Sequence, residues 1–164
     1  MSEPNSPLSN KNLLAGDFDG DAVVACLSAH PDREIGAALH DKNCIQGVDN
    51  ILICEALYVN KTSPWAKVDE VEVTEILNTL RGIAIANRGL ELISTTGTRR
   101  AGHEFYVHAR AHANCRRCRG KIAAAMQGTK PNDRIMYFCP TCQPGEHPQP
   151  LERAARRPAS QTSR

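Results

Sequence analysis

The sequence predicts a mainly α-helical protein that carries a small zinc-bound β-hairpin in its C-terminal half. Two observations predict this fold class. Apolar residues recur at helical spacing through the N-terminal half, and two Cys-x-x-Cys motifs further on enclose a stretch with the composition of two short strands. Aromatic residues are only 4% of the 164 residues, so the apolar core is small and a bound metal would compensate for it.

The first elements are an arm and a helix. Residues 1–16 are polar and proline-rich without periodicity, which predicts a disordered arm. A helix is expected to begin near Asp19 or Asp21, either of which can cap it, and to end before His30, because a proline follows. Its apolar face carries Val23, Val24 and Leu27.

Two further helices are expected around a glycine-containing turn. The second helix is predicted over Arg33–Lys42 with Asp32 as its N-cap, and the third over Ile51–Val59 with Asn50 as a candidate N-cap. Backbone N–H groups at the start of a helix can bind a phosphate, so the turn at 47–50 is either a phosphate site or only a connector.

The fourth helix has the clearest pattern. Asp69 and Glu72 have the spacing of a capping box, and apolar residues then recur at i, i+3, i+4 and i+7 through about Asn87. We therefore predict one helical domain over residues 17–93, closed by a polar, glycine-containing loop at 94–102. The predicted buried stripe is Val73, Ile76, Leu77, Leu80, Ile83 and Ala84.

The two Cys-x-x-Cys motifs predict one zinc site, because a two-residue spacer lets each motif present two sulfurs to the same ion. Four thiolates leave no open coordination position, so the single Zn²⁺ is expected to be structural. The alternative is a pair of disulfides or redox pairs, which nothing at the N-terminus supports. The predicted ligands are Cys115, Cys118, Cys139 and Cys142.

The other three cysteines, Cys26, Cys44 and Cys54, lie in apolar helical patterns and are expected to be small buried apolar residues. The chain shows no run of eighteen apolar residues and no secretory leader, which excludes membrane-spanning and secreted classes. We therefore expect a reducing, cytoplasmic location, at the nucleoid in a bacterium.

A β-hairpin is predicted between the two cysteine pairs. Its strands are expected at 121–126 and 134–138, joined by a turn through 128–133. Together with the preceding linker it forms the predicted zinc module, residues 94–143. Residues 144–164 have almost no apolar side chains and four arginines, which predicts a disordered basic tail.

Charge is divided unevenly along the chain, although the formal net charge is only +2. Residues 1–98 carry seven Lys and Arg against fourteen Asp and Glu, whereas residues 99–142 carry nine against two. A basic zinc module is typical of proteins that bind nucleic acid, because Lys and Arg release condensed counterions from phosphates. The alternative is a basic surface that only contacts solvent.

The helices, the turn, the basic loop and the four-cysteine hairpin, in this order, resemble the C-terminal half of the formamidopyrimidine-DNA glycosylase / endonuclease VIII (Fpg/Nei) family. The resemblance runs from about Phe18 to Gln143. Residues 35–41, 47–50 and 55–58 resemble the helix-two-turn-helix segment of that family. The later matches are Ser63–Trp65, Val107–Arg110, Arg134 and Cys139–Gln143.

The resemblance implies binding to double-stranded DNA that is damaged or abasic. It assigns Asn50 and Arg134 to the phosphates that flank an everted nucleotide, and it adds Arg110 as a third DNA-binding residue. Asp49 departs from the family pattern, which has a glycine there, and its carboxylate is expected to repel the phosphate. A monomer is expected, with other repair proteins as further partners.

The catalytic half of the family has no counterpart in this sequence. The nucleophile of the family is an N-terminal proline amine, followed by glutamate, in a β-sandwich domain, whereas Ser2 and Glu3 follow Met1 here. We therefore expect a DNA-binding protein without glycosylase activity and assign no catalytic residue. The alternatives are an enzyme that acts at abasic sites through another amine or a partner domain, and a zinc-stabilised protein that binds other repair factors.

Overall fold

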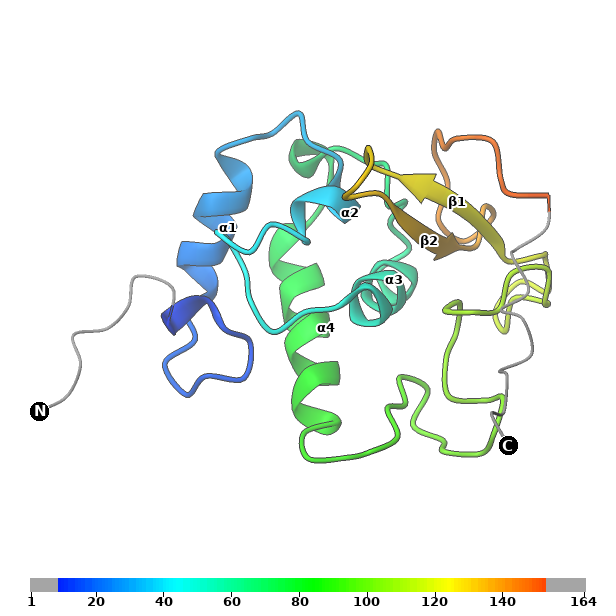
Figure 1. Ribbon diagram of the computed structural model, residues 1–164, viewed down its shortest axis with the longest axis horizontal. Helices are drawn as coiled ribbons and strands as arrows, with labels where there is room; N and C mark the ends of the chain where they lie inside the picture. Colours follow the sequence, from blue (N-terminus) through cyan, green and yellow to red (C-terminus); the bar gives the residue numbers. More distant parts are fainter. Residues whose placement is uncertain (1–8, 153–164) are drawn as a thin grey trace, which may run out of the picture.

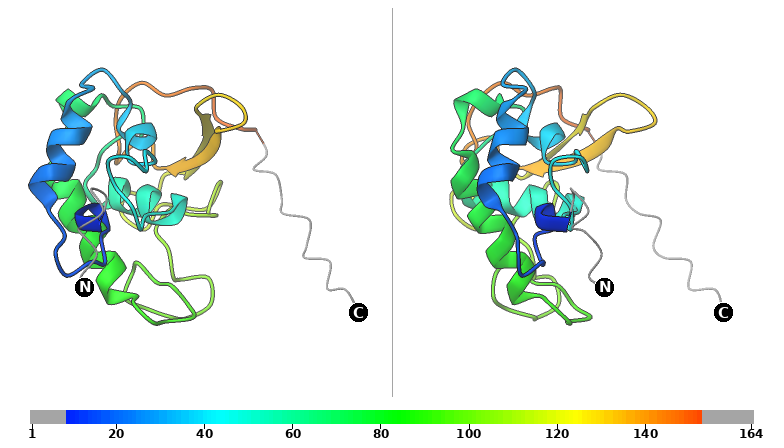
Figure 2. Two further views of the ribbon diagram at one scale, coloured as in Figure 1. Left: turned by 60° about the vertical axis from the view of Figure 1, so that its left-hand side comes forward. Right: turned by 90° about the vertical axis from the view of Figure 1, so that its left-hand side faces the viewer.

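The computed structural model describes residues 9–152, which form a mainly helical protein with one antiparallel hairpin (Figure 1). Helix α3 lies in the middle and contacts α4 on one side and β2 on the other. Figure 2 shows the turn of the hairpin standing out from the body of the molecule. The elements are η1 (Ser9–Lys11), α1 (Gly20–Ser28), α2 (Ile35–Ala38), α3 (Asn50–Val59), η2 (Val68–Glu70), α4 (Val73–Ala86), β1 (Ala123–Gln127) and β2 (Arg134–Phe138).

Helix α3 is the centre of the core, because the consecutive residues from Leu52 to Tyr58 are all buried. A helix that is covered on all sides needs no amphipathic stripe, which is why its pattern predicted the buried face only in part. Asp49 caps this helix, since its carboxylate accepts the N–H of Leu52 at 2.9 Å. The predicted cap, Asn50, is instead the first helical residue.

The predicted helices α1 and α4 are confirmed. Asp19 caps α1 by accepting the N–H of Ala22 at 3.0 Å, and Val23 and Leu27 are buried. Helix α4 buries the predicted stripe against the core, with Ile83 only partly buried. The predicted capping box is wrong: Glu72 makes no capping hydrogen bond, and Glu70 instead accepts the N–H of Lys67 at 3.1 Å, within η2.

Helix α2 is much shorter than the predicted Arg33–Lys42. The residues before it pair with a distant segment, because Ile35 donates its N–H to the carbonyl of Ala66 at 2.7 Å and Val68 donates to that of Arg33 at 2.9 Å. This pairing keeps residues 33–34 extended, so the helix begins only at Ile35, with Glu34 in place of the predicted N-cap Asp32.

The arm and the tail are ordered where the structure describes them. The predicted disorder is wrong for residues 9–16: Leu13 is fully buried and donates to the carbonyl of Gln46 at 3.1 Å. It is also wrong for residues 144–152, where Leu151 donates to the carbonyl of Ala124 at 2.8 Å. Residues 1–8 and 153–164 lie outside the described residues.

Two of the three cysteines that were expected to be apolar core residues form a disulfide. Cys26 in α1 is bonded to Cys44, with their Cα atoms 5.4 Å apart. No pattern in the sequence predicts this pairing, because it is the turn after α2 that brings Cys44 to α1. Cys54 in α3 is fully buried, as expected, and burial raises the pKa of its thiol to about 12.

The predicted hairpin is confirmed, with Ala125 opposite Met136 in an antiparallel register. One face of it packs on the helical part, where Trp65 meets Phe138 edge to face with ring centroids 4.9 Å apart. Within residues 9–152, no helix has the length and apolar character needed to cross a membrane.

Candidate metal centre and anion-binding hollow

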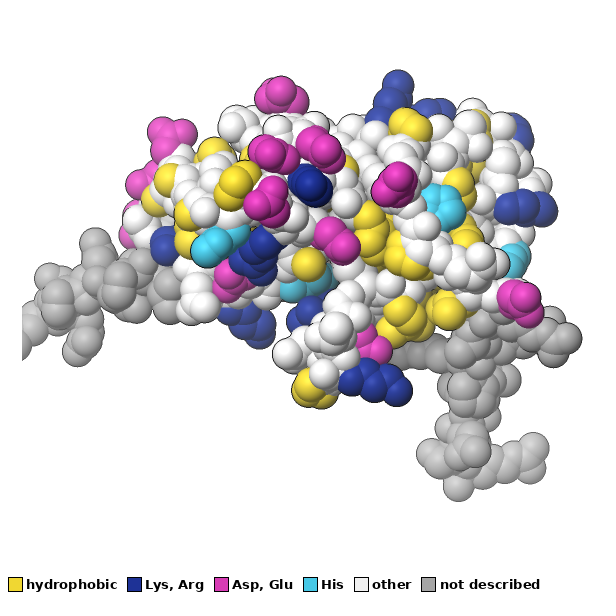
Figure 3. All heavy atoms as spheres, turned by 90° about the horizontal axis from the view of Figure 1, so that it is seen from above, with side chains coloured by type: hydrophobic (Ala, Val, Ile, Leu, Met, Phe, Trp, Pro, Cys, Tyr) yellow, Lys and Arg dark blue, Asp and Glu magenta, His cyan; other side chains and the backbone are white. Residues whose placement is uncertain are grey.

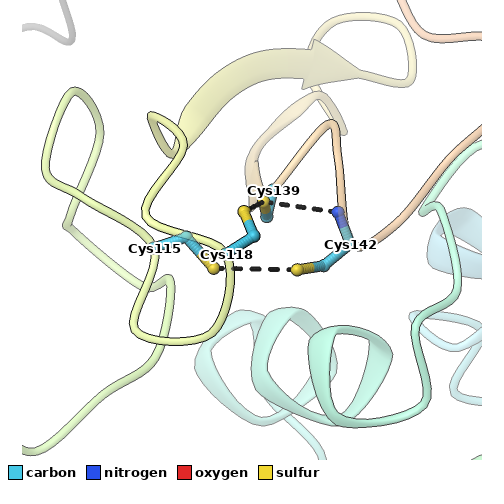
Figure 4. A group of neighbouring side chains, drawn as sticks. All are labelled: Cys115, Cys118, Cys139 and Cys142. Atoms are coloured by element: carbon cyan, nitrogen blue, oxygen red, sulfur yellow. Dashed lines mark hydrogen bonds between the residues drawn. The ribbon is translucent and has the colours of Figure 1, made fainter.

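The four predicted ligand cysteines meet at one point (Figure 4). Their sulfurs all lie within 4.8 Å of one another. The Sγ atoms of Cys115 and Cys142 are 3.8 Å apart, and those of Cys118 and Cys139 are 3.5 Å apart. A tetrahedral site with metal–sulfur bonds of about 2.3 Å requires sulfurs about 3.8 Å apart, so this cluster fits a metal ion.

Side chains from α3 and from the cysteine loop support the cluster. The hydroxyl of Tyr58 lies 3.2 Å from Cys115 Sγ, and the guanidinium of Arg117 covers the Tyr58 ring at 4.6 Å. Burial by itself would raise the pKa of Cys115, but the backbone N–H of Cys118 and the Tyr58 hydroxyl lower it to about 6. The surroundings of Cys115 therefore favour the thiolate, which is the form that binds a metal.

Two buried polar side chains, to which the sequence analysis assigned no structural role, attach the zinc module to the helical part. Gln143 is 1% exposed; it accepts the N–H of Cys139 and donates to the carbonyl of Thr62, both at 2.8 Å. Glu55 accepts the N–H of Tyr106 at 2.8 Å, and burial raises the pKa of its carboxyl to about 7. A glutamate within an apolar helix was the only sequence signal for this contact.

Part of the predicted basic surface is used to hold loops. Arg110 donates to the carbonyls of Tyr106 and Asn114, the latter at 2.9 Å, and Arg116 donates to that of Gly102 at 2.9 Å. The structure does not bring Arg110 to the other predicted DNA-binding residues, and its contact with DNA stays a prediction.

Asn50 and Arg134, in contrast, line the same hollow. This anion hollow, as we call it, has a volume of about 560 Å³ and lies between the turn before α3 and the start of β2. A hydrogen bond joins the two elements, since Asn50 Nδ2 donates to the carbonyl of Ile135 at 2.8 Å. The walls of the anion hollow are formed by Asn12, His40, Lys42, Ile45, Gln46, Gly47, Val48, Asp49, Asn50 and Arg134.

His40 is the residue of this hollow that sequence reasoning missed. Its Nε2 atom lies 3.2 Å from Asn50 Oδ1. Burial, followed by the charge of Arg134, lowers the pKa of His40 to about 4. At neutral pH the imidazole is therefore uncharged.

The charged groups of the hollow are Lys42, Arg134 and Asp49, which leave one positive charge in excess. Gly47 has a φ of +81°, and a Cβ atom there would lie 2.8 Å from Asn12 Oδ1. Glycine is thus required for the chain to make this turn so close to the ordered arm. Donors and cations around a helix N-terminus form a surface that suits an anion.

Charged side chains of both signs lie on the face of the molecule that Figure 3 shows. Acidic side chains gather over its left and centre, where several Lys and Arg side chains lie among them, and further Lys and Arg side chains lie at its upper right edge. A polyanion would approach the parts of this face where Lys and Arg side chains predominate.

The chain is similar in sequence to two groups of known proteins. The chain is 35% identical over 150 residues to the probable endonuclease 8 2 of Streptomyces coelicolor, covering 90% of this chain and 54% of that protein. It is 32% identical over 140 residues to the formamidopyrimidine-DNA glycosylase of Chloroflexus aurantiacus, covering 79% of this chain and 49% of that protein. No protein-family model matches the chain.

Among solved structures, the complex of Lactococcus lactis Fpg with DNA that contains an abasic site has a TM-score of 0.66 and 20% identity. The match covers 82% of this chain and 51% of the Fpg chain. The chain thus spans about half the length of the curated relatives it matches.

Proposed function

We propose that this chain, which is a relative of the Fpg/Nei DNA glycosylases over about half of their length, binds double-stranded DNA and depends on a structural zinc ion to do so. The relationship confirms the resemblance that the sequence motifs suggested. Damaged or abasic DNA is the proposed substrate class.

One observation carries this proposal: Asn50 and Arg134, far apart in the sequence, line one hollow with a net positive charge. Within residues 9–152 the guanidinium of Arg134 makes one hydrogen bond, to the carbonyl of Asn132 at 3.2 Å, so most of its N–H donors are left for a ligand. We assign α2, the turn and α3 as the helix-two-turn-helix element, and the hollow as a site for a backbone phosphate.

Zinc is the proposed occupant of the cysteine cluster. Four thiolates are the ligand set typical of structural Zn²⁺, and the sulfur spacing described above suits its bond length. The ion would hold the open end of the hairpin, where β1 begins and β2 ends, and Arg134, at the turn end of β2, would depend on the ion through the order of the hairpin. A cytoplasmic, DNA-associated location is part of the proposal, and there Cys26 and Cys44 would be reduced.

We further propose that the residues of the anion hollow bind DNA without cleaving it. The groups that line the hollow with Asn50 are suited to hold an anion, and Lys42 is the amine among them. Borohydride trapping on abasic-site DNA tests this part, because only an amine nucleophile forms a covalent adduct. We expect none; an adduct that Lys42→Ala abolishes would instead favour the alternative, an enzyme that acts at abasic sites.

Arg134→Gln is expected to weaken DNA binding by about 1–2 kcal/mol, or roughly 5- to 30-fold, because a charged hydrogen bond to phosphate is lost. The slope of log affinity against log salt should fall by about one in magnitude, because the variant makes one phosphate contact fewer and binding then releases fewer counterions. Fluorescence anisotropy with a duplex containing one abasic analogue, at several salt concentrations, measures both quantities.

Lys61→Gln is the matched control for this change. It removes one positive charge from an exposed residue that does not line the anion hollow, so its effect on affinity should be small. Equal losses for both variants would mean that only overall charge matters. A DNA affinity that does not respond to salt would favour the other alternative, a zinc-stabilised protein whose basic surface binds a protein partner.

Asp49→Asn is expected to tighten DNA binding by up to about 2 kcal/mol at low salt, because a carboxylate near the phosphate is removed. The cap of α3 should survive, since asparagine caps a helix about as well as aspartate does. Asp49→Ala, which loses charge and cap together, should lower the unfolding free energy by about 1 kcal/mol. Unchanged affinity of Asp49→Asn would show that the turn is only a connector.

A further inference from the structure

His40 is placed between two hollows. One is the anion hollow, and the other, of about 570 Å³, lies between α2 and the turn of the hairpin. His40, Lys42 and Arg134 line both of them. The imidazole therefore stands in the wall that the two basic side chains share, next to the proposed phosphate position.

The hydrogen bonds around Asn50 determine which nitrogen of His40 carries the proton. Asn50 Nδ2 donates to the carbonyl of Ile135 at 2.8 Å, which leaves Oδ1 as the acceptor toward His40. His40 Nε2, 3.2 Å away, must then be the donor, and Nδ1 of the neutral ring is a bare acceptor. Among residues 9–152 no hydrogen-bond partner of Nδ1 is found. Nδ1 becomes a donor only when the ring takes up a proton.

Charged groups face this ring from every neighbouring element. Arg134 comes from β2, Lys42 from the segment after α2, and Asp49 from the start of α3. On the side of the second hollow, Arg33 and Asp41 form an ion pair at 2.9 Å and largely cancel each other. The free protein therefore opposes protonation of His40, through burial first and Arg134 second. A phosphate in the hollow would offset the charges of Arg134 and Lys42 and so raise the pKa of His40, although the effect of burial would remain.

We infer that His40 is a third phosphate-binding residue of the anion hollow: neutral, it holds Asn50 in orientation, and in mildly acidic solution it takes up a proton in the DNA complex and donates Nδ1–H to the phosphate. This inference rests on the proposed function and adds proton uptake to it. Asn50 Nδ2 has a second hydrogen, and the His40 contact fixes the amide so that this hydrogen stays available.

The test is DNA affinity as a function of pH. Zinc-loaded protein and a duplex with a pH-insensitive dye are measured from pH 7.5 to 5.5 at constant ionic strength, with zinc content checked at each pH. If the pKa of His40 rises to about 6 in the complex, affinity increases about fourfold over this range. Phosphodiesters keep their single charge throughout, so the DNA itself contributes no such change.

Three variants separate the roles of His40. His40→Gln keeps a neutral N–H donor for Asn50 but cannot titrate, so it should match the parent within about twofold at pH 7.5 and lose the pH response. His40→Ala should bind more weakly than the parent at pH 7.5, with no further loss in an Asn50→Ala background, because the two act together. His30→Gln removes an exposed histidine at the end of α1 and should keep the parental response.

The outcomes distinguish this inference from the proposed function. A parental pH response in His40→Gln would overturn proton uptake by His40, while DNA binding itself stood. Parental affinity of His40→Ala at pH 7.5 would overturn its positioning of Asn50. No binding of DNA by the parent at any pH would overturn the proposed function and this inference together.

Discussion

Removal of the metal is expected to unfold the hairpin first and to abolish DNA binding with it. The metal contributes on the order of 10 kcal/mol in small zinc modules, and this hairpin of two five-residue strands has no comparable support of its own. Cys118→Ser should lose the ion and the affinity for DNA together. Because β2 carries Arg134 and accepts the amide of Asn50, disorder of the hairpin also dismantles the anion hollow.

Three measurements check this expectation: zinc content per chain, DNA affinity, and amide hydrogen exchange. Exchange in β1 and β2 should become fast after chelation, while α1 and α4 stay protected. Cys54→Ala is the control, because Cys54 is a buried cysteine of the same core that lies outside the cluster. It should keep one Zn²⁺ per chain. Much less than one Zn²⁺ in the parent with all four ligand cysteines reduced would contradict the zinc assignment.

Gly36→Ala is expected to lower the free energy of unfolding by about 1–3 kcal/mol. A Cβ atom at this position would lie 2.3 Å from Gln127 Oε1 and 3.0 Å from the carbonyl oxygen of Pro64. Gln127 cannot easily move away, because it is 4% exposed and its Nε2 donates to Glu34 at 2.8 Å and to the Pro64 carbonyl at 2.9 Å. Any shift breaks the contact that joins the end of β1 to α2.

Urea denaturation of zinc-loaded protein measures this loss. Gly82→Ala is the matched control: nothing lies within 4 Å of its added Cβ in α4, so alanine should stabilise the helix by about 0.5–1 kcal/mol. In a Gln127→Ala background, Gly36→Ala should cost much less, since the nearest clash is gone. Parental stability of Gly36→Ala in the natural background would show that β1 does not pack against α2 as described.

The features that the sequence predicted correctly are those set by local physics. The spacing within each cysteine pair brings two sulfurs to one ion, the stripe of α4 repeats every turn, and Asp19 caps α1 three residues before the N–H it accepts. Strand propensity and the intervening turn placed the hairpin of β1 and β2. Each of these depends on residues close together in the chain, so composition and period are sufficient to find them.

Features that depend on residues distant in the chain could not be predicted from the sequence. Pairing with residues 66–68 keeps residues 33–34 extended, so that α2 begins at Ile35. Leu13 is buried because Gln46 pairs with the arm. No period in the sequence encodes such contacts. Burial and Arg134, 94 positions further along the chain, keep His40 neutral beside Asn50. The local elements and the metal ligands were thus predictable from the sequence, whereas the shape and charge of the anion hollow were not, because they arise only once those elements meet in the folded chain.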